Sequence, residues 1–185
     1  GLYELDAATN ITGASSYQYL YTIDAVLSRL NYSYQNKYYF SGSLRSDGSS
    51  RFPKGKRWGT FWSVGASWRL SQEDFMKEIS WVDNLTVKAS YGVQGNDNIL
   101  NDDGTQLYYA WQSFYDLGWP NSTLSGAMIS SLENTGLKWE KNGNLNLGVE
   151  ARLFNRISAT FEWFNRKTTD LLLFYPKAVS TGFSG

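Results

Sequence analysis

The chain has no cysteine and no histidine among its 185 residues. Without cysteine there is no disulfide framework and no thiol chemistry, and without histidine the usual zinc ligand and the usual general base are missing. The sequence also lacks a GxSxG elbow, a phosphate-binding glycine loop and a metal triad. These absences argue against an enzyme, and we predict no catalytic residue, no cofactor and no metal site.

The chain also has no excess of charge of either sign and no long hydrophobic run. Lys and Arg number 17, as do Asp and Glu, so the formal net charge is zero and no nucleic-acid partner is expected. No run of about 18 apolar residues exists, which excludes a transmembrane helix. The mean hydropathy of -0.42 does not exclude a membrane protein, because membrane-spanning strands alternate apolar and polar residues.

The chain is rich in stretches that alternate apolar and polar residues, and in aromatic side chains. In residues 85–93 the odd positions are Leu, Val, Ala, Tyr and Val, and the even positions are Thr, Lys, Ser and Gly. A period of two predicts a β-strand with one dry face and one wet face. Aromatic residues make up 17% of the chain, and amphipathic rings favour boundaries between apolar and wet surroundings.

Six stretches alternate in this way, and their apolar sides carry no charge. We predict strands near residues 25–34, 38–47, 57–70, 85–94, 144–153 and 157–166. The charged residues on their wet sides are Arg29, Arg45, Arg69, Lys88, Glu150, Arg152, Glu162 and Arg166. Ser71 followed by Asp74 resembles a capping box, so a short helical turn is expected at 71–77. The stretch 95–137 is predicted to be a long polar loop.

The connections between these strands alternate in length. They are compact after the first, third and fifth strands, as at 35–37 and 154–155, and longer after the second, fourth and sixth. An antiparallel meander places successive connections at opposite ends of the sheet, so one end should carry short turns and the other long loops. Outer-membrane barrels have this asymmetry, with short periplasmic turns and long extracellular loops.

The dry faces could meet lipid or a protein core. Strands of about ten residues suit a tilted membrane crossing, aromatic residues gather towards the ends of the dry faces, and the wet faces are rich in Ser, Gly, Asn and Thr. A soluble β-sandwich also alternates and stays open as an alternative. Six strands cannot close a membrane barrel, since the smallest have about eight. The predicted fold is therefore all-β, an antiparallel meander of about six strands forming part of a large transmembrane β-barrel.

Several motifs are similar to those of one family. The run RSDGSSRF at residues 45–52 and RWGTF at 57–61 resemble its signatures, and further matching segments follow in order. These segments are 68–76, 85–96, LKWEK at 137–141 and NRKTTDLL at 165–172. The resemblance is to the SusC/RagA family of TonB-dependent outer-membrane transporters, and it covers about residues 30–172.

The resemblance implies a barrel of roughly 22 strands closed by a plug domain. It implies import of oligosaccharide or peptide substrate across the outer membrane, a SusD-like surface lipoprotein as a lid, and a TonB-type energy-coupling protein that contacts the parent's N-terminal part. Residues 1–185 would then be a fragment of the C-terminal β-barrel domain, without the plug. The charged wet-side residues would contact the plug or line the transport path.

Two rival functions are kept. A passive outer-membrane porin would share the lipid-facing barrel but lack the plug and the energy coupling. A soluble carbohydrate-binding β-sandwich would use the dry face as its core.

The candidate substrate-binding residues come from one loop. It holds Phe114 and five further aromatic residues, namely Tyr108, Tyr109, Trp111, Tyr115 and Trp119. Exposed rings on a loop are unusual unless they pack or bind, and sugars stack on such rings. The functional interpretation is a substrate platform, and the alternative is a small core that folds the loop onto the barrel.

Two polar groups near the loops have weaker claims. Asp47, Arg51 and Arg57 flank a Gly/Ser loop, where they could contact ligand or set the shape of the barrel rim through ion pairs. The runs 96–98 and 101–104 offer hard oxygen ligands for calcium, but their spacing does not fit an EF-hand. Solvation of a polar loop is the expected role of these oxygens.

Overall fold

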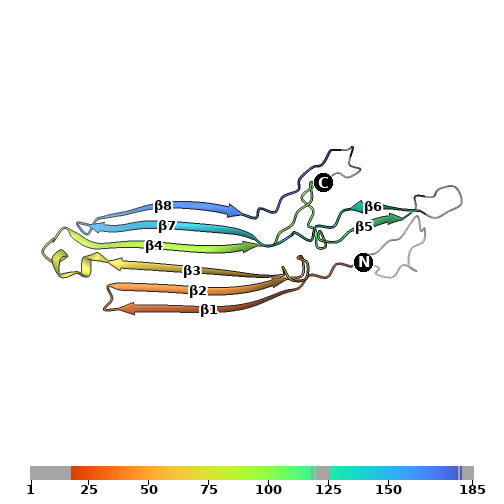
Figure 1. Ribbon diagram of the computed structural model, residues 1–185. Coiled ribbons are helices and arrows are strands. Elements are labelled where there is room, and N and C mark those ends of the chain that lie inside the picture. Colours follow the sequence, from red (N-terminus) through yellow and green to blue (C-terminus); the bar gives the residue numbers. More distant parts are fainter. Residues whose placement is uncertain (1–17, 118, 120–125, 179, 181–185) are drawn as a thin grey trace, which may run out of the picture.

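The computed structural model describes residues 18–117, 119, 126–178 and 180. One antiparallel sheet contains six strands in the order β1-β2-β3-β4-β7-β8, so each strand lies beside the next long strand of the chain. The strands are β1 (Ile23–Tyr34), β2 (Tyr38–Ser49), β3 (Trp58–Arg69), β4 (Val82–Asn96), β7 (Glu140–Leu153) and β8 (Ile157–Thr169). The predicted antiparallel meander is confirmed (Figure 1).

The register gives the sheet two chemically distinct faces. Paired residues of neighbouring antiparallel strands point to the same side of the sheet. One such row across the sheet is Tyr34, Tyr38, Trp68, Val87, Val149 and Phe161. A row of the opposite face is Arg29, Ser43, Ser63, Gly92, Asn144 and Arg166. The predicted alternation therefore persists from strand to strand as a continuous apolar face and a continuous polar face.

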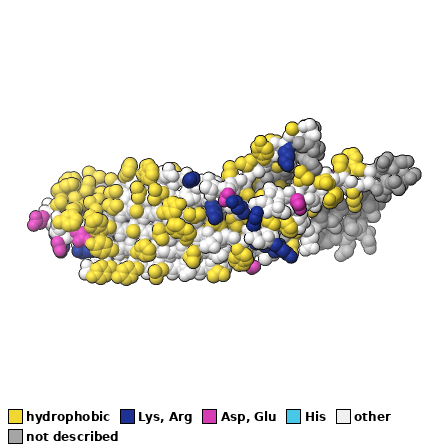
Figure 2. Space-filling model, viewed as in Figure 1, with side chains coloured by type: hydrophobic (Ala, Val, Ile, Leu, Met, Phe, Trp, Pro, Cys, Tyr) yellow, Lys and Arg dark blue, Asp and Glu magenta, His cyan; other side chains and the backbone are white. Residues whose placement is uncertain are grey.

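The apolar face is not covered by any other part of the described chain. Val26 is 68% exposed, Leu30 63% and Phe161 69%, although all three lie at dry positions of regular strands. Figure 2 shows hydrophobic side chains spread over the strands, with charged ones gathered near the two ends. A sandwich needs this face packed against a second layer, and the described residues supply none. Soluble proteins rarely expose an apolar surface of this extent, so the face suits lipid.

The buried core is small and lies at one end of the sheet. It consists of Phe52, Phe61, Ile99 and Trp139, which are the buried hydrophobic residues of the described chain. The ring of Trp139 lies 5.3 Å from that of Phe52 and 5.2 Å from that of Phe61. This core joins the connection between β2 and β3 to the two limbs of the connection between β4 and β7. It organises the loops, while the strands are held by their ladder hydrogen bonds.

The two ends of the sheet differ as predicted. At the turn end, which carries the connections 35–37, 70–81 and 154–156, Gln35 and Asn36 adopt positive φ, as do Phe154 and Asn155. Two consecutive residues with positive φ form the tight hairpin turn that suits strand twist. A bulky residue such as Phe154 is uncommon there, and its ring stacks on Trp81 at 5.9 Å, which offsets the strain.

The helical turn expected at 71–77 forms, but the capping box is wrong. It consists of two 3-10 turns, η2 (Leu70–Gln72) and η3 (Asp74–Met76), which begin after Arg69 and Glu73 without side-chain caps. Ser71 lies inside η2 and hydrogen-bonds to Asn84 at 3.2 Å. An extended residue, Glu73, separates the two turns, so Ser71 and Asp74 never share one helix. Among the described residues, no helix is both long and apolar enough to cross a membrane.

The long stretch 95–137 is more ordered than the loop prediction allowed. It contains a two-stranded hairpin, β5 (Phe114–Leu117) and β6 (Ala127–Ser131), which projects beyond the loop end of the sheet (Figure 1). The flanking strands are also longer than predicted, because the β4–β7 ladder continues to the pair Asn96 and Glu140. The loop end is thus the end with the connections 50–57 and 97–139.

Candidate functional site

The polar face carries the charged residues assigned to the wet sides of the strands. Arg45 Nε donates to Asp47 at 2.7 Å, and Lys88 forms an ion pair with Glu150 on the neighbouring β7. Arg166 Nε donates to Asn144 at 2.9 Å, and the Arg69 guanidinium lies 5.4 Å from the ring centre of Tyr39. The face curves around a hollow of about 680 Å³ near the loop end. The polar face of the sheet is therefore concave and carries charged side chains.

A cluster at the loop end joins three segments that are distant in sequence. We call Tyr21, Ser49, Arg51, Asp97 and Tyr108 the Arg51 cluster. Arg51 Nη1 lies 3.3 Å from Asp97 Oδ1 and donates to the Asp97 carbonyl at 3.2 Å. The hydroxyls of Tyr21 and Ser49 donate to Asp97 Oδ2 at 3.0 and 2.7 Å. The Asp97 carboxylate therefore receives donors from the segment before β1, from β2 and from the connection after it.

Aromatic rings enclose the cation of the Arg51 cluster. Its guanidinium carbon lies 4.1 Å from the ring centre of Tyr21 and 5.3 Å from that of Tyr108, which are cation–π distances. Arg51 is only 6% exposed. Burial, with the hydrogen bond to Asp97, raises the pKa of the Tyr21 hydroxyl above its ordinary value. A buried arginine in this setting depends on its carboxylate partner.

The three charged residues flanking the Gly/Ser loop do not converge. Asp47 pairs with Arg45, Arg51 pairs with Asp97, and Arg57 Nε donates to the carbonyl of Phe52 at 3.2 Å. Each interaction fixes local structure at the rim, as the structural interpretation of these residues expected. What the sequence did not reveal is the partner of Arg51, which stands 46 residues away.

The oxygen-rich runs at 96–98 and 101–104 shape the loop. The Asn96 side chain accepts from the amide of Asn98 at 3.0 Å, and Asp103 accepts from the amide of Thr105 at 2.8 Å. The hydrogen bond from Thr105 lowers the pKa of Asp103. Asp97 belongs to the Arg51 cluster. Within the described ranges no group of three or more Asp or Glu residues is arranged to hold a metal ion.

The five aromatic candidates divide into two groups. Tyr108 stacks on Tyr19 at 5.2 Å, and the Tyr109 hydroxyl contacts the backbone of Leu20, accepting from its amide at 3.0 Å. Trp111 is half-buried, with its indole N–H enclosed. Tyr108 and Tyr109 therefore pack the loop onto the segment before β1.

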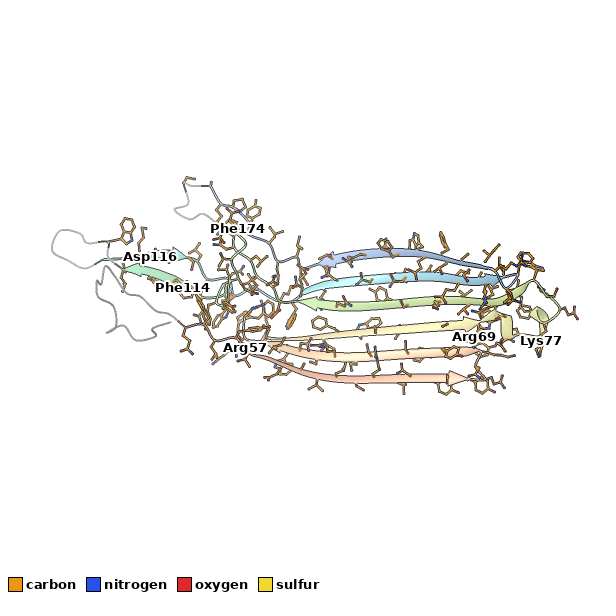
Figure 3. The ribbon with its side chains drawn as sticks, turned by 180° about the vertical axis from the view of Figure 1, so that it is seen from behind. Arg57, Arg69, Lys77, Phe114, Asp116 and Phe174 are labelled. Carbon is orange, nitrogen blue, oxygen red and sulfur yellow. The ribbon has the colours of Figure 1, made fainter. Side chains whose placement is uncertain are left out.

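The other candidates, Tyr115 and Trp119, face solvent at 59% and 58% exposure. Phe114, which accompanied the five in the sequence pattern, is also exposed, and Figure 3 shows it on the hairpin together with Asp116, far from Arg69 and Lys77 at the turn end. The packing interpretation therefore describes Tyr108 and Tyr109, and the substrate platform stays a prediction for the exposed residues.

At the turn end, the carboxylate of Glu73 accepts hydrogen bonds from two rings of a row of stacked aromatic side chains. Tyr34 stacks on Tyr38 at 6.4 Å and Tyr38 on Trp68 at 6.2 Å, all on the apolar face. Glu73 accepts from the Tyr38 hydroxyl at 2.7 Å, the Trp68 indole at 3.1 Å and Lys37 at 3.1 Å. These hydrogen bonds, that from Tyr38 first, lower the pKa of Glu73. The arrangement is that of an interfacial aromatic girdle.

The family model described as "TonB dependent receptor-like, beta-barrel" matches residues 3–185. The chain belongs to that family. The TonB-dependent receptor SusC of Bacteroides thetaiotaomicron is 34% identical over 88% of this chain, and the TonB-dependent receptor P39 of Formosa agariphila is 31% identical over 95% of it. The chain spans 16% of the length of each of these two relatives.

Solved structures agree with the family. The RagAB peptide transporter superposes with a TM-score of 0.76 at 32% identity, over 89% of this chain and 18% of that one. The RagAB peptide importer in its closed-closed state gives 0.76 at 33% identity, over 89% of this chain and 17% of that one. The resemblance to the SusC/RagA family is confirmed. TonB-dependent receptor barrels are outer-membrane proteins, so the apolar face of the sheet faces lipid and the polar face lines the lumen.

Sequence reasoning missed several residues of these sites. Tyr21 lies just ahead of the alternating pattern, and Ser49 reads as one more small residue of a Gly/Ser run. Glu73 and Glu140 were not singled out, although Glu140 is buried and accepts from the amide of Leu172 at 3.0 Å. The available signal for Glu73 was its place in the expected turn at 71–77, directly after a strand with aromatic residues on its dry face.

Proposed function

We propose that the parent protein imports oligosaccharide or peptide fragments across the outer membrane, and that this chain supplies part of its barrel wall and extracellular loops. The observation that carries the proposal is the sheet itself, with an uncovered apolar face on one side and a charged concave wall on the other. Membership of the TonB-dependent receptor family supports active import over passive diffusion. The role is transport, and no catalytic step is assigned to the chain.

The proposal includes partners outside this chain. A plug domain occupies the lumen and contacts the charged wall, including Arg29, Arg152 and Glu162. A TonB-type protein couples energy through the parent's N-terminal part, and a SusD-like surface lipoprotein covers the loop end. SusC and the RagAB peptide transporter, to which the chain is similar, support this assignment. Residues 1–185 are in this proposal a fragment of the C-terminal barrel domain.

The aromatic residues take two roles in the proposal. Tyr115 and Trp119, which are exposed beyond the loop end, contact substrate or the lid. Tyr108 and Tyr109, which pack onto the segment before β1, and the half-buried Trp111 hold the loop that carries them. Flat rings serve both oligosaccharides and peptides, because each presents an apolar surface with polar edges.

The test is uptake by cells that carry the full-length parent, with a fluorescent oligosaccharide pool and a fluorescent oligopeptide pool as probes. We expect saturable uptake of one pool that stops when a protonophore collapses the inner-membrane gradient. Tyr115→Ala with Trp119→Ala should raise the half-saturating concentration about tenfold, the effect of losing aromatic anchors.

The matched control is Trp163→Ala, which removes an exposed ring from the lipid face. Uptake of both pools that ignores the protonophore would establish a porin. Unchanged saturation in the Tyr115/Trp119 variant would remove these residues from the substrate path.

A further inference from the structure

The connection between β2 and β3, residues 50–57, contacts both limbs of the long 97–139 connection. On the outgoing limb, Arg51 forms an ion pair with Asp97, and its guanidinium lies 5.3 Å from the ring centre of Tyr108. On the returning limb, Lys56 Nζ donates to the carbonyl of Thr135 at 2.9 Å, and Trp139 Nε1 donates to that of Arg57 at 2.7 Å. One short connection therefore holds the base of the long one.

We infer that Arg51 is the positioning residue of this base, fixing the limb 98–111, and through it the β5–β6 hairpin, relative to the end of the sheet. The position of the loop depends on these contacts whichever substrate the parent carries and whether or not the hairpin binds it.

Arg51 is suited to this role by the direction of its contacts. Its guanidinium binds Asp97 at the root of the limb, and the ring of Tyr108, further along the limb, lies against one side of the guanidinium. Tyr21, from the segment before β1, supplies a second ring. The planar cation thus joins two points of the limb to the rim at once, a geometry that a lysine cannot reproduce.

Burial makes the contact decisive for the limb. Arg51 and Asp97 have side-chain exposures of 7% and 16%, so the removal of either leaves a charge without its partner in a poorly hydrated place. The ion pair is reinforced next to it, where the Tyr109 hydroxyl contacts the amide and the carbonyl of Leu20 at 3.0 and 3.3 Å. Loss of Arg51 would loosen the limb on this side, where the packing of Ile99 in the core and the Tyr109 contact remain.

Beyond the limb, the hairpin has little support of its own. β5 and β6 pack chiefly on each other, and Leu117 at the end of β5 is 82% exposed. A short two-stranded hairpin is marginal in isolation. Its direction must therefore come from its two attachments, of which the outgoing one ends at the Arg51 cluster and the returning one at Lys56 and Trp139.

The experiment measures the position of the hairpin in the full-length parent. Spin labels at Leu117→Cys in β5 and Thr60→Cys in β3 report one distance by pulsed electron resonance, and this chain contributes no cysteine of its own. We expect a narrow distribution in the parent. Arg51→Gln should at least double its width, while the heat-modifiable migration that reports a folded barrel persists.

The matched control is Arg45→Gln, which breaks another arginine–carboxylate pair at the same end, that with Asp47, and touches neither limb. Its distribution should stay narrow. If Arg51→Gln fails to fold, Tyr108→Leu replaces it, because it removes one ring from the cation and leaves the ion pair intact. A distribution as narrow as the parent's in a folded Arg51→Gln or Tyr108→Leu barrel would overturn the inference, as would equal broadening in the Arg45→Gln control.

Discussion

Gly95 lies directly against the ring of Phe61. A β-carbon added at Gly95 would stand 2.1 Å from Phe61 Cζ, closer than any real contact, and one added at Gly59 would stand 2.5 Å from the same atom. Phe61 is 5% exposed and belongs to the small core at the loop end. Two glycines therefore leave the space that this ring fills, and the loops of the loop end rest on it.

Gly95→Ala should destabilise the loop end through overpacking, by about 1–3 kcal/mol. The temperature at which the purified parent loses its heat-modifiable migration measures this. Gly42→Ala is the control, because its added carbon meets its nearest neighbour at 3.8 Å. The double variant Gly95→Ala with Phe61→Val should recover part of the lost stability, because the smaller Val makes room for the added carbon. Equal melting of the Gly95 and Gly42 variants would contradict the packing described.

Leu147→Arg should block barrel assembly. Leu147 lies on the apolar face in the middle part of β7, paired with Ala89 and Trp163, and a cation at the bilayer midplane costs about 2–4 kcal/mol. The neighbouring Asn146→Arg places the same charge in the lumen and should assemble. Heat-modifiable protein in isolated outer membranes gives the readout. Normal assembly of Leu147→Arg would reverse the two faces assigned to the sheet.

Acid should weaken the turn end through Glu73. Hydrogen bonds from Tyr38, Trp68 and Lys37 lower the pKa of this carboxyl in the folded chain below its unfolded value of about 4.3. The contribution of Glu73 to stability is therefore complete above the unfolded pKa and disappears as the pH falls through the lowered folded pKa.

The measurement is the melting temperature of the parent and of Glu73→Gln between pH 7 and pH 3. The variant should melt lower at neutral pH, and the two curves should converge in acid. Glu78→Gln, which changes an exposed acid of the same connection, is the control and should follow the parent. A difference between parent and Glu73→Gln that stays constant with pH would show that charge on Glu73 is not what stabilises the turn end.

The six strands were predictable because lipid imposes a uniform rule on one face. Within each strand, every second residue must be tolerable in hydrocarbon, as Val26 is in the first strand and Trp163 in the last, so the period is visible wherever a strand crosses the membrane. The rule stops at the membrane surface. β7 begins four residues earlier than predicted, through the polar run from Glu140 to Gly143, because there the ladder continues where lipid no longer constrains the side chains.

The loop end was only partly predictable, for the opposite reason. β5 and β6 are short, and in β5 the acidic Asp116 shares a face with Phe114 while Tyr115 and Leu117 share the other, so no alternation of apolar and polar faces is established. The partner of Arg51 depends on how two distant connections fold together, and a local pattern carries no information about Asp97. The different surroundings of Tyr108 and Tyr115 were likewise not predictable, because they depend on Tyr19, in the segment before β1, stacking on Tyr108.

The closing pair of the β4–β7 ladder brings the departure and the return of the long connection together, since Asn96 faces Glu140 and donates to it at 3.3 Å. The connection 97–139 therefore begins and ends at one pair of neighbouring residues. A connection whose ends are adjacent can be lengthened, shortened or replaced at small entropic cost, and the membrane-spanning strands keep their positions. The sheet and the long connection can therefore change in sequence at different rates during evolution.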